Sequence, residues 1–504
     1  MPMPYSKLLM LAATVSLIPS IQSQDWPQWR GPQRDARAAG FRAPATWPTE
    51  LAQKWKVTVG EGVATPALVG DRLFVFSRQN DFEVTRCLAV ADGKEVWQDK
   101  YESLGASGPA ASFSGPRSSP AVADGKVVTL GVRGMVSGLE AASGKVLWRK
   151  DDFHAYPNFH PSSSPMIWKG LAVVQCGGRE NGALVAYDLS TGNQKWSRPG
   201  PSPSYASPVL LNLGGAELVI AQTESKLLAI NAADGALVWE STAAAQEGPG
   251  GPGGPGGPGG PGGPGGPGGP GGPGGPGGGR RMGGGGGRDY RATTPIVDGV
   301  RIIVAGRGVR SVGLAKEGDK VTDKEQWNNA DMALSFSSPV LKDGKLYGLT
   351  GNNELVCLDA KSGAKVWQAP FPSTSTEGGG PRAALELPEL QVGRAGVFAQ
   401  ADPGAGERPP GGRPGGPGGP GGPGGGRGGM RGGGQGYGSI VDAGSVLMAL
   451  TPGGELVVFE PNAAEFKMLA KYRVASGQTH AYPVVSGNRI FVKDGDSVTL
   501  WTLP

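Results

Sequence analysis

Cysteine and histidine are both rare in this sequence, with three of each among 504 residues. Cys87, Cys176 and Cys357 are too few and too widely spaced for a disulfide framework. Cys87 and Cys357 occupy the same place in two repeated segments, so we interpret them as small buried hydrophobic residues. No cysteine lies at the cleavage site predicted below, and we therefore expect no lipid attachment.

The scarcity of histidine limits the possible metal sites. His154 and His160 lie close together in the segment His154-Ala155-Tyr156-Pro157-Asn158-Phe159-His160, which makes them the candidate metal ligands. Zinc or copper would need further ligands in a defined geometry, and no Cys, Asp or Glu lies between the two histidines. We predict a loop here and no metal site. His480 stands at the start of a repeat, where we expect it to lie at an edge.

Common catalytic motifs are also missing. The sequence has no Gly-x-Ser-x-Gly elbow, no HExxH helix and no P-loop, and its glycine-rich stretches lack the strand–turn–helix context of a phosphate-binding loop. We therefore predict no catalytic residues. A hydrolase of sugar chains would need two carboxylates at a defined separation, a pair that the sequence alone does not locate.

One apolar run of 11 residues, Leu8–Ile18, is too short to cross a bilayer core of about 30 Å. Lys7 precedes it, and Ile21-Gln22-Ser23 ends in a small residue. This pattern predicts a signal peptide over residues 1–23 and a mature chain that starts near Gln24. We expect a periplasmic or secreted protein with no transmembrane segment.

Glycine and proline are abundant, with 90 and 45 residues, but they cluster in two tracts that we place at residues 247–289 and 402–436. Prolines recur at every third position from Pro249 to Pro276, each flanked by glycines. Such spacing formally satisfies the collagen rule, but a second glycine in each triplet favours disordered, partly polyproline-II inserts over a triple helix.

The two tracts also carry the basic charge. Residues 248–288 and 404–434 each contribute +3, against +5 for the whole chain, which leaves −1 elsewhere. The segment Arg427–Gly433 resembles RNA-binding RGG segments, but export argues against a nucleic-acid partner. Weak attachment to an anionic surface polymer remains a hypothesis on charge alone.

Two markers recur along the rest of the chain, and self-similarity of this kind indicates a repeat fold. The first is a small polar residue followed by proline, an apolar residue and a β-rich run; it occurs at Thr65, Ser119, Ser164, Ser207, Thr294, Ser338 and Tyr482, with a weaker copy lacking proline at Gly438. The second is a glycine followed four residues later by tryptophan, in the pairs Gly93 and Trp97, Gly144 and Trp148, Gly192 and Trp196, Gly235 and Trp239, and Gly363 and Trp367.

Without the tracts, the period approaches 40–50 residues, which is typical of a four-stranded propeller blade. One such sheet cannot bury both faces alone, whereas stacking covers them and ring closure removes exposed edges. We predict an all-β, eight-bladed β-propeller with four-stranded antiparallel blades, forming a single monomeric domain over residues 24–504. The tryptophans would wedge between blades. The segment Leu51–Val57 would supply the outer strand that the last blade lacks.

The repeated Gly-Lys-x-x-Trp units and Ser-Pro openings resemble the pyrroloquinoline-quinone-like propeller superfamily, which contains quinoprotein alcohol dehydrogenases and the outer-membrane assembly lipoprotein BamB. The segment Asp25–Asp35, DWPQWRGPQRD, is similar to the start of an exported quinoprotein-like group common in planctomycete bacteria. The enzyme branch carries a vicinal cysteine pair beside its quinone and oxygen ligands around Ca²⁺. No two cysteines are adjacent here, and the missing lipidation cysteine departs from BamB.

These observations favour a non-catalytic binding or scaffold module of the cell envelope. Loops on the propeller would contact a protein or a cell-envelope polymer, a role that rests on fold-level analogy. The alternative is a quinone-dependent dehydrogenase, or a degenerate relative of one, with pyrroloquinoline quinone and calcium. We otherwise predict no cofactor.

Overall fold

The structure is a computed structural model that describes residues 24–242, 291–318, 320–372, 437–462 and 464–504. The expected signal peptide, residues 1–23, and the two expected inserts, 247–289 and 402–436, lie outside the described residues. The chain divides into two units, Met1–Phe371 with Gly433–Pro504, and Pro372–Gly432. All described strands belong to the first unit. That residues 24–504 form one domain stays a prediction.

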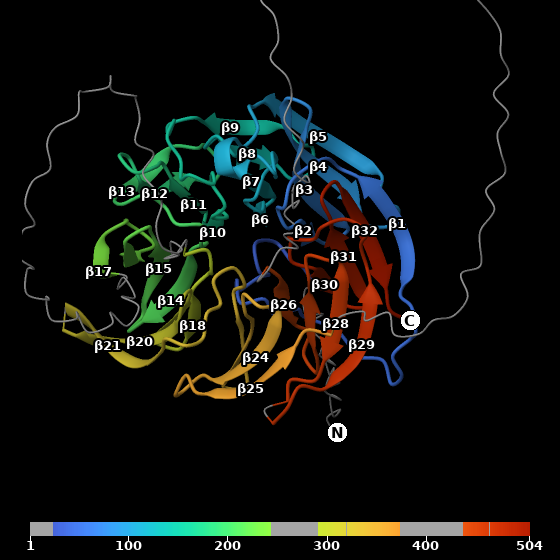
Figure 1. Ribbon diagram of the computed structural model, residues 1–504. Coiled ribbons are helices and arrows are strands. Elements are labelled where there is room, and N and C mark those ends of the chain that lie inside the picture. Colours follow the sequence, from blue (N-terminus) through green and yellow to red (C-terminus); the bar gives the residue numbers. More distant parts are fainter. Residues whose placement is uncertain (1–23, 243–290, 319, 373–436, 463) are drawn as a thin grey trace, which may run out of the picture. The chain divides into compact units, whose positions relative to one another are not determined.

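Eight four-stranded antiparallel sheets follow one another around a common axis (Figure 1). Blades 1 to 4 consist of β2 (Ala67–Val69), β3 (Arg72–Gln79), β4 (Phe82–Ala89) and β5 (Glu95–Glu102); β6 (Ala121–Ala123), β7 (Lys126–Leu130), β8 (Val136–Glu140) and β9 (Val146–Lys150); β10 (Met166–Trp168), β11 (Leu171–Cys176), β12 (Ala183–Asp188) and β13 (Gln194–Pro199); and β14 (Val209–Leu213), β15 (Ala216–Gln222), β16 (Lys226–Asn231) and β17 (Leu237–Thr242). A short 3₁₀ turn, η1 (Gly108–Ala110), follows blade 1.

Blades 5 to 8 repeat the arrangement. They consist of β18 (Ile296–Asp298), β19 (Arg301–Ala305), β20 (Val309–Glu317) and β21 (Lys320–Asn329); β22 (Val340–Lys342), β23 (Lys345–Leu349), β24 (Glu354–Asp359) and β25 (Lys365–Pro370); β26 (Ser439–Asp442), β27 (Leu447–Leu450), β28 (Glu455–Phe459) and β29 (Met468–Arg473); and β30 (Val484–Ser486), β31 (Arg489–Lys493), β32 (Ser497–Thr502) and β1 (Ala52–Thr58). The predicted eight-bladed propeller of four-stranded blades is confirmed.

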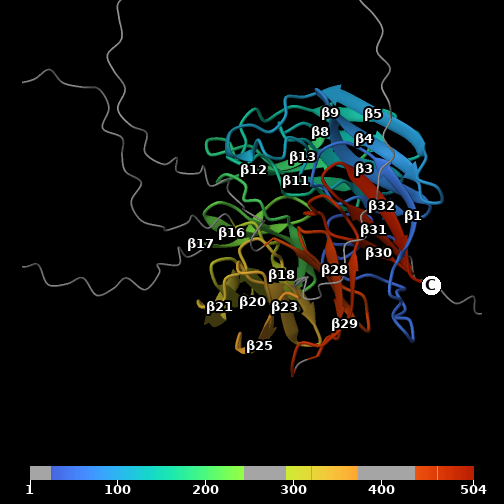
Figure 2. The same ribbon diagram turned by 45° about the vertical axis from the view of Figure 1, so that its right-hand side comes forward.

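The ring closes through β1, which joins the sheet of the last three strands. Ala52 pairs with Thr502 and Thr58 with Ser497 in an antiparallel register. Figure 2 shows β1 in blue beside β32 in red, although they come from opposite ends of the described chain. The prediction that an N-terminal strand completes the last blade is confirmed, with the strand shifted by one residue from Leu51–Val57 to Ala52–Thr58.

The middle strands of each blade are buried because neighbouring blades cover both of their faces. β7, for example, reads KVVTL, and only its first residue is partly exposed. β-branched residues suit such pleated, two-sided burial. Tight turns join these strands, and at Gly125 the backbone φ of +69° requires a conformation that glycine adopts without steric cost.

A tryptophan on the outer strand of one blade packs against a glycine in a turn of the next. Trp148 donates its indole N–H to Leu189 O at 3.0 Å, and its ring lies against Gly192. Four more tryptophans repeat this arrangement, each with a carbonyl acceptor and a glycine in the next blade: Trp97 with Ala141 O and Gly144, Trp196 with Ala232 O and Gly235, Trp55 with Val90 O and Gly93, and Trp327 with Ala360 O and Gly363. The structure thereby places all five marker glycines beneath the indole of the preceding blade. Trp239 and Trp367 donate instead to Asp323 Oδ1 and Asn462 O.

Candidate functional site on the ring axis and the loop face

A ring of hydroxyl groups surrounds the axis where each inner strand begins. The hydroxyl of one blade accepts the backbone N–H of the corresponding residue in the preceding blade. The links join Tyr482 N–H to Thr65, Thr65 to Ser119, Ser119 to Ser164, Ser164 to Ser207, Ser207 to Thr294 and Thr294 to Ser338, over 2.8–3.4 Å. The polar residue of the repeat's first marker therefore connects the blades, which explains why it is Ser or Thr in six copies.

The hydroxyl ring is interrupted at blade 7, where the corresponding residue, Gly438, has no side chain. Arg30 links the two sides of this interruption. Its Nη1 donates to Ser338 O at 3.0 Å in blade 6 and to the Tyr482 hydroxyl at 2.9 Å in blade 8. Its Nη2 donates to Pro339 O at 2.7 Å.

Arg30 belongs to an N-terminal segment, residues 24–38, that we call the axial plug. Trp26 exchanges two backbone hydrogen bonds with Leu68 of blade 1, and Val122 of blade 2 donates to Pro27 O. Ala38 N–H donates to Asp442 O of blade 7. The Trp29 indole N–H donates to the Thr294 hydroxyl of blade 5 at 2.9 Å. Because these partners lie on or directly before the inner strands of blades 1, 2, 5 and 7, the plug crosses the axis.

Arg34 extends from the plug to a further blade. Its guanidinium donates to Pro165 O at 2.8 Å and Ser164 O at 3.0 Å in blade 3, and to Gln28 Oε1 at 3.0 Å. Arg34 is 4% exposed and Arg30 is 1% exposed. Burial, with the nearby Arg30 charge as a second cause, lowers the pKa of Arg34 to about 9, so the side chain is still cationic at neutral pH.

Loops that join the outer strand of one blade to the inner strand of the next lead into the hydroxyl ring and form the end of the propeller that we call the loop face. Four aromatic rings from different loops contact one another there. Phe113 meets His480 edge-on at 4.9 Å, His480 meets Tyr437 edge-on at 5.5 Å, and Tyr437 stacks on Phe336 at 4.6 Å between ring centroids. This aromatic row connects the loop before blade 2 with the loop before blade 6. Sequence analysis identified His480 only as an edge residue and missed the row.

The two candidate metal ligands have different surroundings. His160 is buried, its Nε2 accepts the Ser107 N–H at 3.0 Å, and its Nδ1 lies 2.9 Å from Val132 O. Both ring nitrogens therefore have partners within the chain, and burial lowers the pKa of His160. His154 is exposed and lies 3.7 Å from Asp151. The structure gives no common ligand position to these two histidines.

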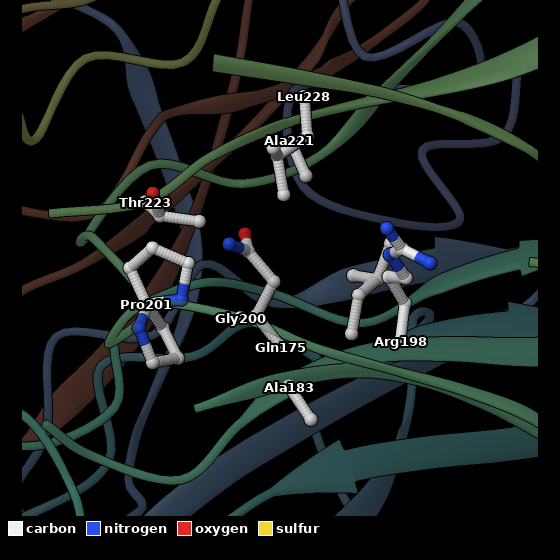
Figure 3. Close-up of a pocket in the computed structure, with 10 residues that line it drawn as sticks. Gln175, Ala183, Arg198, Gly200, Pro201, Ala221, Thr223 and Leu228 are labelled. Atoms are coloured by element: carbon white, nitrogen blue, oxygen red, sulfur yellow. The ribbon is translucent and has the colours of Figure 1, made fainter. Parts of the chain in front are cut away.

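A small hollow lies between blades 3 and 4 (Figure 3). In this view Ala221 and Leu228 face Ala183, with Arg198 at one end and Pro201 at the other. The hollow has room for about one water molecule, about 10 Å³, far below the roughly 300 Å³ at which small-molecule sites begin. The hollow is therefore too small to define a substrate pocket.

Together, the fold, the Trp–Gly contacts between blades and the closed axis define a propeller of the quinoprotein type. The family described as "Outer membrane protein assembly factor BamB" matches residues 48–150, 80–250 and 292–405, more than half of the chain, and the chain belongs to this family.

Three comparisons illustrate the similarity. The outer membrane protein assembly factor BamB of Bordetella pertussis is 25% identical over 199 residues, 38% of this chain and 46% of that protein, so the match spans about half of the curated relative. The crystal structure of BamB from Moraxella catarrhalis has a TM-score of 0.52 at 12% identity and covers 90% of this chain and 98% of that one. Quinohemoprotein alcohol dehydrogenase from Comamonas testosteroni has a TM-score of 0.56 at 12% identity, over 95% and 80% of the two chains. The two structural comparisons show a shared fold.

The residues that the structure describes do not fit a quinone–calcium centre. The three thiols are buried in β4, β11 and β24, which belong to blades 1, 3 and 6, so no two of them can form a vicinal disulfide. Across the described part of the chain, no group of three or more His, Cys, Asp or Glu side chains could hold a metal ion. A calcium ion takes six to eight oxygen ligands. The cationic Arg30 and Arg34 would in addition repel a divalent cation at the axis.

Proposed function

We propose that this chain is an exported, non-catalytic module of the cell envelope that binds a protein partner through its loop face. Membership of the BamB family supports an assembly or scaffold role over a catalytic one. Export rests on the signal-peptide pattern at residues 1–23. Among the described residues, no helix has the length and apolar character to span a bilayer.

The observation that carries the proposal is apolar and aromatic surface on the loop face. Leu104, in the loop between blades 1 and 2, is 72% exposed, and Tyr437 of the aromatic row is 40% exposed. Phe113 lies in the same loop as Leu104 and contributes to the row. Aromatic side chains are enriched at protein interfaces because they bury a large area at a small cost in conformational entropy. An envelope polymer is the other partner that this surface could contact.

The test replaces Leu104 with glutamate in the full chain and cross-links the protein within the cell envelope of its host. Because Leu104 is exposed, we expect the variant to fold. The yield of one or a few cross-linked proteins should fall about tenfold or more, the scale of a disrupted interface hot spot.

Val300→Glu provides the matched control. Val300 is 45% exposed and lies in the turn between β18 and β19, at the opposite end of the blades from the loop face. Cross-linking should be unchanged in this variant. Equal yields from both variants and the unmodified chain would overturn the proposal, and cross-linking to polymer alone would replace the protein partner with the polymer.

The shared fold with a quinohemoprotein alcohol dehydrogenase favours a second candidate, a quinone-dependent dehydrogenase. The test is to add pyrroloquinoline quinone with Ca²⁺, desalt the protein, and record the absorbance of the retained cofactor. Retention of one quinone per chain would replace the binding proposal. We expect no retention, because neither a cysteine pair nor a set of cation ligands is present in the described part of the chain.

A further inference from the structure

The guanidinium groups of Arg30 and Arg34 are both buried, and neither forms an ion pair with a carboxylate among the described residues. Among the described residues, Arg30 and Arg34 make hydrogen bonds to carbonyl oxygens, to the Tyr482 hydroxyl and to Gln28, but no ion pair. Other charges in this region are paired. Asp442 lies 3.0 Å from Lys342 Nζ and 3.5 Å from Arg37 Nε. Two like charges thus remain in a region from which water is largely removed, which is unfavourable without a counter-ion.

Three N–H donors of the axial plug also lack an acceptor within the described chain. They are Nε of Arg30, Nε of Arg34 and Nε1 of Trp26, all three with less than 1 Å² of exposed atomic surface. The residues lie four positions apart along one segment. Burying an N–H group without an acceptor costs free energy, so native proteins satisfy nearly all such groups with protein, water or an ion.

The backbone of the plug has an unusual conformation at three positions. Arg30, Arg34 and Ala36 have φ values of 60°, 60° and 65°, in the left-handed region that residues other than glycine seldom adopt. Strain of this kind persists where the surrounding contacts determine it, and it is concentrated at binding sites.

We propose that the axial plug holds a small monovalent anion, such as chloride, bound by the Nε–H groups of Arg30 and Arg34. The anion neutralises part of the buried positive charge and accepts hydrogen bonds from two N–H groups that have no acceptor within the described part of the chain. The carbonyl groups of Ser338, Pro339, Ser164 and Pro165 occupy the Nη sides of the two guanidinium groups. The Nε sides are therefore the ones left for an anion. Because the plug joins blades all around the ring, the ion stabilises ring closure, independently of any partner on the loop face.

Halide titrations test the proposal. The melting temperature of the full chain is measured in sodium chloride, sodium bromide and sodium gluconate at constant ionic strength. Chloride and bromide should raise it in a saturable manner, by about 3 °C at a concentration 100-fold above the dissociation constant, whereas the bulky gluconate should not. Arg34→Met should abolish the difference between chloride and gluconate. Arg37→Met is the matched control, because Arg37 belongs to the same plug but has a side chain that is 55% exposed, and it should retain the difference.

Crystals of the unmodified chain grown with bromide supply a second readout that does not depend on a variant folding. An anomalous difference peak should lie within hydrogen-bond distance of Nε of Arg30 or Arg34. Arg34→Lys, which keeps the positive charge but removes the Nε–H, should weaken the peak. The proposal is overturned by an ordered water without anomalous signal at this position, or by a chloride effect of equal size in the unmodified chain, Arg34→Met and Arg37→Met.

Discussion

The contact between Trp148 and Gly192 allows a quantitative test of how neighbouring blades are held together. An ideal Cβ built at Gly192 would lie 2.6 Å from Cγ and 2.8 Å from Cδ2 of Trp148, well inside van der Waals contact. Gly192 also has a φ of +70°. Gly192→Ala therefore introduces two costs at once, a strained backbone and a collision with the indole of the preceding blade.

Gly125 separates these two costs. Its φ of +69° is almost the same, but a Cβ built there has no heavy atom within 4 Å. Gly125→Ala should lower the free energy of unfolding by about 1–2 kcal/mol, the cost of a left-handed conformation for a residue with a Cβ. Gly192→Ala should lower it by a further 1–3 kcal/mol or so, the cost of overpacking a buried contact.

The assay is urea-induced unfolding followed by far-ultraviolet circular dichroism, with the three proteins compared at equal concentration. A double-mutant cycle completes the test. In a Trp148→Ala background, Gly192→Ala should cost less than in the unmodified chain, because Cγ and Cδ2 are removed and only the contact with Cβ of residue 148, at 2.8 Å, remains. Equal losses for Gly192→Ala and Gly125→Ala in the unmodified background would refute the argument that the indole requires glycine beneath it.

Three further predictions concern buried polar groups. Burial lowers the pKa of Lys493 to about 8, below its unfolded value of about 10.4, so the unfolded chain binds more protons between these pH values. From pH 8 to 10 the unmodified chain should therefore gain about 1–3 kcal/mol of stability relative to Lys493→Met. Parallel stability–pH profiles of the two proteins would contradict this prediction. Ser164→Ala leaves the buried N–H of Ser119 without its acceptor and should lower the free energy of unfolding in urea by about 1–3 kcal/mol. Ser164→Thr keeps the hydroxyl and should lower it much less. Equal losses for the two variants would argue against the hydroxyl ring. The three buried thiols should not react with an aromatic disulfide reagent at pH 8 in the native protein, and all three should react in denaturant, whereas rapid native reaction would contradict their burial.

The architecture could be predicted from local sequence signals because each of the eight blades must bury both faces of a four-stranded sheet in the same way. Ser-Pro openings, turn glycines and β-branched runs recur in phase, so the blade count and the closing strand could be predicted before any coordinate was known. Trp327 escaped notice because Asp323, and not glycine, stands four residues before it; the glycine of the preceding turn, Gly318, is nine residues away. Its indole nevertheless packs on Gly363 as the other markers do. Blade 7 has Tyr472 on its outer strand, with the hydroxyl donating to Pro48 O.

The axial plug was beyond sequence reasoning for a different reason. Residues 25–35 are recognisable as a motif, but their partners lie on inner strands up to hundreds of positions away, and no periodic signal points to them. Arg30 and Arg34 look like ordinary surface residues in the sequence, since burial of an unpaired arginine contradicts every compositional expectation. The aromatic row is hidden similarly, because each ring comes from a different loop.

The order in which the chain is made gives the closing sheet a further consequence. β1 is synthesised early, yet its only neighbour in the sheet is β32, which is among the last residues to be made. Contacts so distant in sequence form slowly, because a large loop must close before they contribute. We therefore expect β1 to remain unpaired until β32 has been made, and to be exposed during that interval to chaperones, to proteases and to pairing with another copy.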